Sequence, residues 1–458
     1  MRKRVTLALV LSCLLPATVH ARQAPDDTAL IRAIRANDLA AARSALSSRG
    51  HSSHEWAYGD APLALAVDTQ NPAMVALLLK SGADPDHADD LGLTPLALAC
   101  ELGDPGIVLQ LVDAHADVRK AGPGGTAPLA VCARFSSAET IRRMLAAGAV
   151  PDSIDARGQT PLMWAASAGN EDAMRLLLDA GADANRVSQG GFTPLFFAIK
   201  SGRTEPVQLL LDAGADHTFR GPENTSAVQL AMYQGNYGAA AILIKRGTDV
   251  DERDRRGLQL LHQAAAAGDA GLVRLLLAEG ADPNGLSGPS RIKWVTEANF
   301  GVAPPPVPPA PPLFIAAANG NAEVMKLLVQ AGAQGRYVAG DGTSVVHAAA
   351  KGGSASALEY ALNLAPDANH VDAGGNTPLH VLLGNGLQPE LESMMRVLAR
   401  HGARVDMANK QGYSARDLAE NSLSEVKEMF VKVFAGPIAI LPARAQATPA
   451  EQPKPAIG

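Results

Sequence analysis

The residues of this sequence that could carry out chemistry are scattered, and they form no catalytic or metal-binding pattern. His51 and His54 lie three positions apart near an expected loop, but no cysteine or third ligand accompanies them, which argues against a zinc site. The patterns GxSxG, the Walker phosphate loop and HExxH do not occur. We therefore expect no catalytic residue, no metal ion and no cofactor.

Two other patterns place polar or flexible residues at regular intervals. Acidic residues recur in GADPD, GADAN and GTDVD, but they lack the twelve-residue ligand spacing and the closing glutamate of a calcium loop. Short Asp and Asn side chains form turns, and we interpret these acids in that way. The pairs Gly124-Gly125 and Gly190-Gly191 are expected at hairpin tips, where no phosphate is needed.

The elements that carry these residues are pairs of short helices, seen most clearly between Asp155 and Val187. Thr160 can cap the first helix of this unit, and Pro161 suits its first turn because a proline there sacrifices no hydrogen bond. Asn170 can cap the second helix, and a glycine ends each one. Helices of two or three turns are marginal alone, so the unit must stack on copies of itself.

Copies of the unit follow at a constant spacing of 33 residues, interrupted twice. The positions equivalent to Pro161 are Pro62, Pro95, Pro128, Pro194, Ala227 and Leu260, then Pro312, Val345 and Pro378, and finally Ala415. The two interruptions are steps of 52 and 37 residues. The glycine that closes the second helix keeps the same spacing, with His115 and Ala365 in its place in two units.

This pattern resembles the ankyrin repeat, whose period and T-P-L-H-x-A signature it shares. The signature stands here as TPLALAC from Thr94, TPLMWAA from Thr160, TPLFFAI from Thr193 and TPLHVLL from Thr377. The resemblance covers about residues 28–433. It implies an all-α ankyrin-repeat solenoid of about 11–12 helix-turn-helix units with short β-hairpin-like fingers.

The resemblance also implies roles for residues inside the signature. His262, His347 and His380 stand two positions after the proline or its equivalent, where ankyrin repeats use histidine to hydrogen-bond between neighbouring turns. Trp164 and Phe197 occupy a place that is normally part of the core.

We divide the chain into six segments on composition and spacing. These are a signal peptide at 1–21, an N-terminal capping helix pair at 22–56, ankyrin repeats at 57–284, a proline-rich insertion loop at 285–311, ankyrin repeats with a C-terminal cap at 312–434, and a disordered Pro/Ala-rich tail at 435–458.

The first segment has the three parts of a bacterial secretory signal. Arg2, Lys3 and Arg4 precede an apolar run too short to span a bilayer, and Val19-His20-Ala21 offers a cleavage site before residue 22. A lipoprotein would need Cys13 as the lipidated residue, but Cys13 lies inside the apolar run. We expect a periplasmic protein, with secretion beyond the periplasm as an open alternative.

Charge and hydropathy narrow the classes of partner. The formal net charge is −6, and loss of the three leader cations leaves 37 basic residues against 46 acidic ones, or about −9. Such a charge disfavours nucleic acid and anionic lipid. No segment after the leader has the roughly 20 apolar residues of a membrane helix. We expect a monomer without a membrane span.

Cys100 and Cys132 lie in the first helices of adjacent repeats. Neighbouring helix axes lie about 8–10 Å apart, whereas a disulfide needs Cα atoms within about 7 Å. This comparison favours two buried thiols, with a disulfide as the alternative.

The remaining candidate site is a surface that binds another protein. In this family the finger tips and the ends of the first helices line the concave face, and aromatic residues and arginine anchor interfaces. The candidate partner-binding residues are Tyr58, Leu91, Leu93, Arg134, Phe135, Arg157, Phe192, Lys200, Tyr233, Arg255, Arg256, Trp294 and Phe300.

The sequence thus predicts a non-catalytic, exported protein-protein interaction module. A secreted effector or a periplasmic scaffold is the first alternative. The second is an enzyme with a site at the 285–311 insertion, where Arg291, Lys293 and Glu297 supply the ionisable groups.

Overall fold

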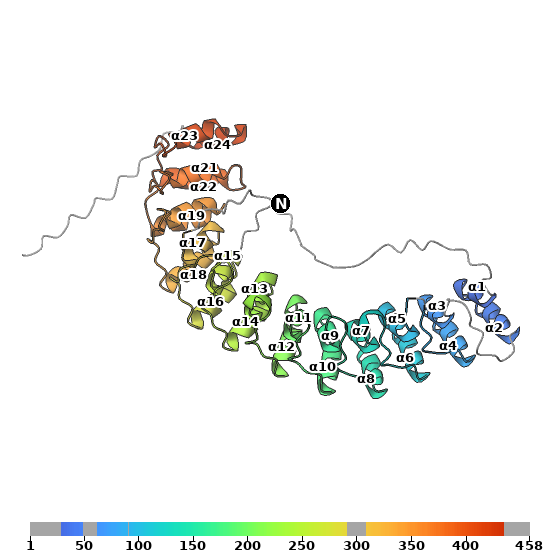
Figure 1. Ribbon diagram of the computed structural model, residues 1–458. Coiled ribbons are helices and arrows are strands. Elements are labelled where there is room, and N and C mark those ends of the chain that lie inside the picture. Colours follow the sequence, from blue (N-terminus) through green and yellow to red (C-terminus); the bar gives the residue numbers. More distant parts are fainter. Residues whose placement is uncertain (1–28, 49–61, 90, 291–307, 435–458) are drawn as a thin grey trace, which may run out of the picture. The chain divides into compact units, whose positions relative to one another are not determined.

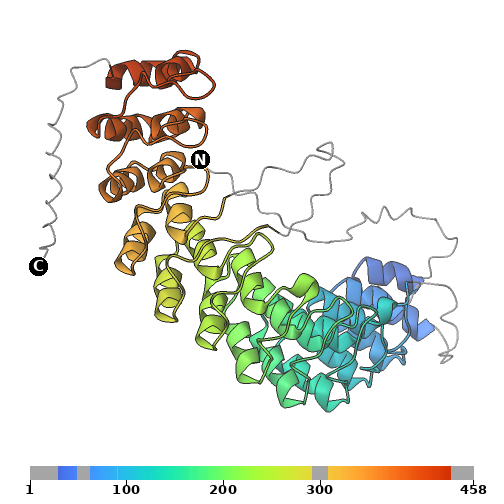
Figure 2. The ribbon, with the colours of Figure 1, turned by 60° about the vertical axis from the view of Figure 1, so that its left-hand side comes forward.

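The structure is a computed structural model that describes residues 29–48, 62–89, 91–290 and 308–434. These residues form 24 α-helices and two 3₁₀ helices, η1 (Pro123–Gly125) and η2 (Pro222–Asn224). The chain divides into two compact units, one made of the described parts of residues 1–161 with 179–181, the other of residues 162–178 with 182–458. Each unit is a series of antiparallel helix pairs that follow one another in chain order (Figures 1 and 2).

The helix pairs have the following bounds. The first eight helices are α1 (Ala29–Arg35), α2 (Leu39–Ser48), α3 (Pro62–Asp68), α4 (Pro72–Lys80), α5 (Pro95–Leu102), α6 (Pro105–Asp113), α7 (Pro128–Phe135) and α8 (Ala138–Ala146). The next eight are α9 (Pro161–Ala168), α10 (Glu171–Asp179), α11 (Pro194–Lys200), α12 (Glu205–Asp212), α13 (Ala227–Gln234), α14 (Tyr237–Lys245), α15 (Leu260–Ala267) and α16 (Ala270–Ala278). The last eight are α17 (Pro312–Ala318), α18 (Ala322–Gln330), α19 (Val345–Lys351), α20 (Ala355–Leu364), α21 (Pro378–Gly384), α22 (Leu391–Arg400), α23 (Ala415–Glu420) and α24 (Ser424–Phe434).

The first helix of every pair from α3 to α23 begins at one of the equivalent positions that the spacing defines. In α5 the cause is local: the Thr94 hydroxyl accepts a hydrogen bond from the Ala97 N–H at 3.1 Å, and Pro95 occupies the first turn. Gly103 then ends the helix in a left-handed conformation. The predicted cap Asn170 accepts from the Ala173 N–H at 3.2 Å. These contacts confirm the all-α repeat.

Two repeats lack the glycine that closes the second helix, and their backbones turn there in different ways. His115 adopts the left-handed conformation itself, with a φ of 62°. Ala365 does not, because its φ is −132°, and its helix α20 extends for ten residues. A histidine in the left-handed region carries a steric cost that glycine avoids, so the spacing, and not the residue type, defines this turn.

The core lies between successive helix pairs. In the first unit α3 packs on α5 and α5 on α7, while α4 packs on α6 and α6 on α8. In the second unit the first helices pack in the order α11, α13, α15, α17, α19, α21 and α23. Small alanines alternate with leucines in this core, and Leu96, Leu129, Leu195 and Leu313 are fully buried. Each pair therefore buries its apolar residues only against its neighbours.

The stacking continues across the 285–311 insertion. Helix α15 packs on α17 and α16 on α18, although 33 residues separate α16 from α17. The described ends of the insertion meet, because the Ser287 N–H donates to the Ala310 carbonyl at 3.0 Å. The predictions for the leader, for Tyr58, for Trp294 and Phe300, for Arg291, Lys293 and Glu297, and for the tail all concern residues outside the described ranges.

The fingers between helix pairs are hairpin-like turns, as predicted. Four isolated antiparallel bridges occur in the described part of the chain, for example between Arg220 and Ser226. The turn acids also act as predicted, since the Asp84 and Asp183 carboxylates accept hydrogen bonds from backbone N–H groups two residues later at 2.9 and 2.8 Å.

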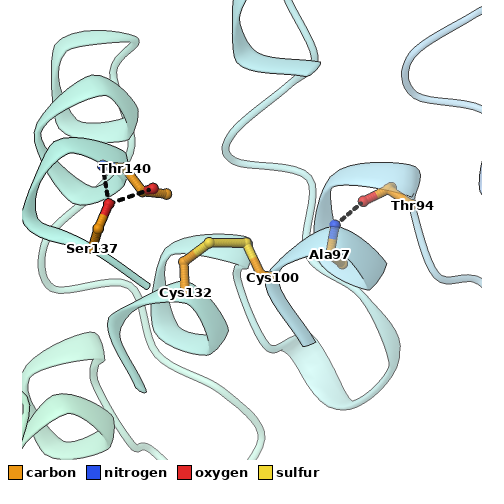
Figure 3. The surroundings of a disulfide bond; sticks show 6 residues. All are labelled: Thr94, Ala97, Cys100, Cys132, Ser137 and Thr140. Carbon is orange, nitrogen blue, oxygen red and sulfur yellow. Dashed lines mark hydrogen bonds between the residues drawn. A yellow bond between two sulfur atoms is a disulfide. The ribbon is translucent and has the colours of Figure 1, made fainter. Parts of the chain in front are cut away.

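The prediction of two free thiols is wrong, because a disulfide joins Cys100 in α5 to Cys132 in α7 (Figure 3). Both residues are fully buried, and their Cα atoms lie 4.6 Å apart. The comparison of helix axes with the reach of a disulfide overlooked the helix radius of about 2.3 Å. Two facing Cα atoms come closer than the axes by about twice that radius.

Candidate functional site

The signature histidines are structural. The Ser344 hydroxyl contacts His347 Nδ1 at 2.9 Å, and the His347 Nε2 atom contacts the Asn376 carbonyl of the following repeat at 2.9 Å. His380 contacts the next finger at Tyr413 in the same way, at 3.1 Å. The predicted bridging role is confirmed. Within the described ranges no three His, Cys, Asp or Glu side chains are grouped so that they could hold a metal ion.

In the first unit, the candidate residues with the largest exposed apolar side chains are Leu91 in a finger and Phe135 at the end of α7. Leu91 is 74% exposed and Phe135 is 58% exposed. The Arg134 guanidinium lies 4.7 Å from the centre of the Phe135 ring. Leu93 is half-buried, and Arg157 is exposed. The disulfide links α7 to α5, so it fixes the helix that carries Phe135.

In the second unit a small aromatic cluster surrounds Phe192. Its ring centre lies 5.9 Å from that of Phe196 and 6.4 Å from that of Phe197. Phe196 is buried, whereas Phe192, Phe197 and Trp164 are half-buried. Trp164 and Phe197 therefore lie at the edge of the core and not fully inside it. Lys200, the last residue of helix α11, which also carries Phe196 and Phe197, is exposed.

The second unit also holds a pocket of about 610 Å³ beside the ends of α13 and α15 and the finger between them. Its lining residues are Met232, Tyr233, Tyr237, Arg255, Arg256, Leu258, Gln263, Ala266 and Ala267. Three of the predicted partner-binding residues, Tyr233, Arg255 and Arg256, thus share one concave site.

The pocket exists because the end of α15 is made of small residues. Lys200, Tyr233 and Ala266 occupy equivalent positions in successive repeats. A long side chain fills this position in the first two, whereas Ala266 and the adjacent Ala267 leave space beside the Tyr233 ring. The alanines are also good helix formers, so α15 does not lose its geometry to make this space.

Two arginines form the polar side of the pocket. Arg255 makes an ion pair with Glu223, and the Arg256 Nε lies 3.3 Å from the Asp254 carboxylate, whose side chain is fully buried. The Arg256 guanidinium also lies 5.8 Å from the centre of the Tyr233 ring, within cation–π range. Both arginine side chains remain 53% exposed.

Burial raises the pKa of the Tyr233 hydroxyl above its ordinary value, and the nearby Asp254 carboxylate adds to the rise. Tyr233 is therefore a neutral donor and acceptor at physiological pH. The pocket combines the neutral Tyr233 hydroxyl, two cations and an apolar floor, which is the composition of a binding anchor.

Gln263 is the lining residue that sequence reasoning missed and that most needs an explanation. It is 8% exposed, and its amide nitrogen has no hydrogen-bond partner. The equivalent positions in the other repeats are all apolar: Leu65, Leu98, Val131, Trp164, Phe197, Leu230, Ile315, Ala348, Val381 and Leu418. A single polar residue in this apolar column was the available signal.

Two family models describe the same repeats. A model of ankyrin repeats in three copies matches residues 30–122, 63–155, 129–221 and 313–409, and a second model of many ankyrin repeats matches residues 228–277. Ankyrin repeat domain-containing protein 37 from Xenopus tropicalis is 37% identical over 78 residues, which are 17% of this chain and 45% of that protein. The chain therefore spans less than half the length of this relative.

The fold and the surface define a helical repeat protein whose candidate binding residues, where the structure describes them, lie on fingers and first helices. The chain belongs to the ankyrin repeat family, as its resemblance predicted. Ankyrin repeats typically mediate protein-protein interaction and are generally non-catalytic. In the ranges that the structure describes, every helix is too short or too polar to cross a bilayer.

Proposed function

We propose that this chain is an exported protein that binds a protein partner through its fingers and the ends of its first helices. The observation that carries the proposal is the pocket in which Tyr233, Arg255 and Arg256 meet. Exposed Leu91 and Phe135 add apolar anchors in the other unit. Apolar and aromatic side chains of this size, left exposed next to arginine, are typical of the central residues of interfaces.

The disulfide supports export. Disulfides persist in oxidising compartments such as the bacterial periplasm and are rare in the cytosol. Cys100 and Cys132 are fully buried in adjacent helices, so their bond stabilises the fold and is poorly placed for redox signalling. Together with the secretory pattern of residues 1–21, this favours the periplasm of a Gram-negative bacterium.

Affinity capture tests the binding surface. The full chain and its Phe135→Ala/Phe192→Ala/Tyr233→Ala variant are used to capture proteins from periplasmic extract. We expect a partner that the wild type retains and that the variant loses by at least about tenfold, because these side chains supply the anchors of the proposed surface.

The matched control carries Arg142→Ala, Arg175→Ala and Arg274→Ala. These arginines lie on second helices and are 57%, 62% and 57% exposed. The control should retain the partner. Equal capture by all three proteins, or loss only in the second-helix variant, would contradict the proposed surface.

Export is tested by expressing the full chain in a Gram-negative host and separating periplasm from cytoplasm. We expect the protein in the periplasmic fraction, with a mass that places its first residue at Arg22. Retention of residues 1–21 in a cytoplasmic protein would contradict this part of the proposal, and it would leave the binding surface untouched.

A further inference from the structure

The Tyr233 pocket, which is lined by the nine residues named above, contains a buried polar group that apolar contacts with a partner do not explain. Gln263 places a buried amide nitrogen without a hydrogen-bond partner in its wall. An unpaired buried donor destabilises a folded protein, and a leucine, valine or isoleucine occupies this position in most other repeats. A polar residue at this position therefore points to a ligand that completes its hydrogen bonds.

The donors around Gln263 identify the chemistry of that ligand. Arg255 and Arg256 have five N–H groups each, and one close acidic partner apiece. Tyr233 and Tyr237 add hydroxyl groups to the lining. Asp254 occupies only the Nε donor of Arg256, at 3.3 Å, because its other carboxylate oxygen accepts from the backbone N–H groups of Arg256 and Leu258 at 2.8 Å and the side chain is buried. The site thus presents several donors to a ligand that accepts.

The charge of the surroundings selects among acceptors. Glu223 and Asp254 balance the two arginines, so the four groups together carry no net charge. A phosphate dianion would leave two charges uncompensated at this neutral site, whereas a carboxylate leaves one and matches the planar guanidinium group. An apolar floor is provided by Met232, Leu258 and the alanines of α15. It can contact the methylene groups of the acidic side chain that carries the carboxylate and the residue next to it in the ligand.

We propose that the Tyr233 pocket binds the carboxylate of a Glu or Asp residue in an acidic peptide segment of the protein partner. This inference rests on the proposed function. The carboxylate lies against the guanidinium groups of Arg255 and Arg256. The amide of Gln263 turns about its terminal torsion, which is soft, and donates to the same carboxylate. An apolar residue next to the acid covers Met232 and Leu258.

Selection from a random peptide display library tests the proposal with the full chain. The library is selected in parallel on the wild type, on Gln263→Leu and on Arg255→Ala/Arg256→Ala. Arg274→Ala is the control, because Arg274 has a similar exposed ion pair, with Glu323 at 3.0 Å, but lies on the second helix α16. We expect peptides from the wild type and the control to be enriched at least about threefold in Asp and Glu, and peptides from Arg255→Ala/Arg256→Ala to show no enrichment. Peptides from Gln263→Leu, which keeps both arginines, should be less enriched than those from the wild type.

One selected peptide then serves as the probe for affinity measurements. Replacement of its acidic residue by the matching amide should weaken binding at least about tenfold to the wild type and leave binding to Arg255→Ala/Arg256→Ala unchanged. Gln263→Leu keeps both arginines, so its binding should weaken by less than that of the wild type. Gln263→Leu should also unfold at the same or a higher temperature than the wild type. Weaker binding to this variant therefore cannot be assigned to misfolding.

Three results would overturn the inference. They are selection without acidic enrichment, acidic peptides that bind the pocket variants as well as the wild type, and tighter binding when phosphoserine replaces the acid. In each of these cases the capture experiment above can still succeed, so failure of the carboxylate pocket is distinguishable from failure of the proposed function.

Discussion

Gln229 and Gln263 are buried glutamines in the first helices of adjacent repeats, but their surroundings differ. The amide of Gln229 accepts from the Ser226 N–H at 3.3 Å and donates to the Arg253 carbonyl at 3.1 Å. The amide nitrogen of Gln263 has no partner. Since a satisfied buried amide stabilises a fold and an unsatisfied one destabilises it, the two residues should respond oppositely to the same substitution.

We expect Gln263→Leu to leave the free energy of unfolding unchanged or to raise it by about 1 kcal/mol, because it removes an unpaired donor. Gln229→Leu should lower that free energy by about 1–3 kcal/mol, because it removes both hydrogen bonds of the buried amide, to the Ser226 N–H and the Arg253 carbonyl. Urea denaturation of both variants measures the difference. A larger loss for Gln263→Leu than for Gln229→Leu would show that the Gln263 amide already has its partner within the fold.

His262 gives the protein a pH-dependent stability. Its side chain is fully buried, and its Nε2 lies 2.9 Å from the Ala310 carbonyl at the far end of the insertion. Burial lowers the pKa of His262 from 6.5 to about 4 and, by the same cause, lowers that of His347. The folded state therefore holds a neutral imidazole at pH values where the unfolded chain binds a proton.

The direction in which stability changes with pH follows from this difference in proton binding. The stability contribution of neutral His262 is complete above pH 6.5 and is lost as the pH falls towards 4, by about 3 kcal/mol over the whole interval. We expect urea midpoints of the second unit to fall through that interval. The variant His262→Gln should flatten the dependence, because its amide can reach Ala310 as Gln229 reaches Arg253, without titrating. An unchanged pH profile in His262→Gln would exclude His262 as the source.

At the scale of elements, most of the helices could be predicted from the sequence. Capping residues, prolines and glycines act within one turn of the chain, so α5, α11 and α21 begin where their Thr-Pro pairs stand. The disulfide could not be predicted in this way, because the separation of facing Cα atoms depends on which sides of α5 and α7 meet. The Tyr233 pocket depends in the same way on how the end of α13 faces Ala266 and Ala267 of α15.

The disulfide is a covalent cross-link between helices α5 and α7 of the first unit. It closes a loop across a sequence separation of 32 residues, for which chain entropy gives about 3–4 kcal/mol of stabilisation. In urea denaturation, we expect Cys100→Ala/Cys132→Ala to lose most of this stabilisation, and its free energy of unfolding should not change with reductant. The free energy of unfolding of the wild type should fall when the disulfide is reduced. Peptide mapping without reductant should find the two cysteines joined. A free thiol at either position in protein purified without reductant would contradict the account.

At the scale of the whole molecule, the repeat pattern was predictable because it is set by repetition. Each helix pair contacts its neighbours, so the step of 33 residues defines the array even where Ser226 and Gln259 replace the usual threonine. The chemistry of the partner was not predictable, because it follows from departures from the pattern. Gln263 and Ala266 are such departures, and their meaning appears only when the neighbouring repeats are in place.

Hydrogen–deuterium exchange of the full chain, with and without its captured partner, tests the central claim most directly. We expect slower exchange on binding in the fingers and first helices of the second unit, at residues 189–202, 222–235 and 253–267. Residues 205–212, 240–245 and 270–278 of the second helices, none of which lines the pocket, should exchange as in the free protein. Protection confined to those second helices, with none at Tyr233, Arg255 or Arg256, would contradict the claim that this surface binds the partner.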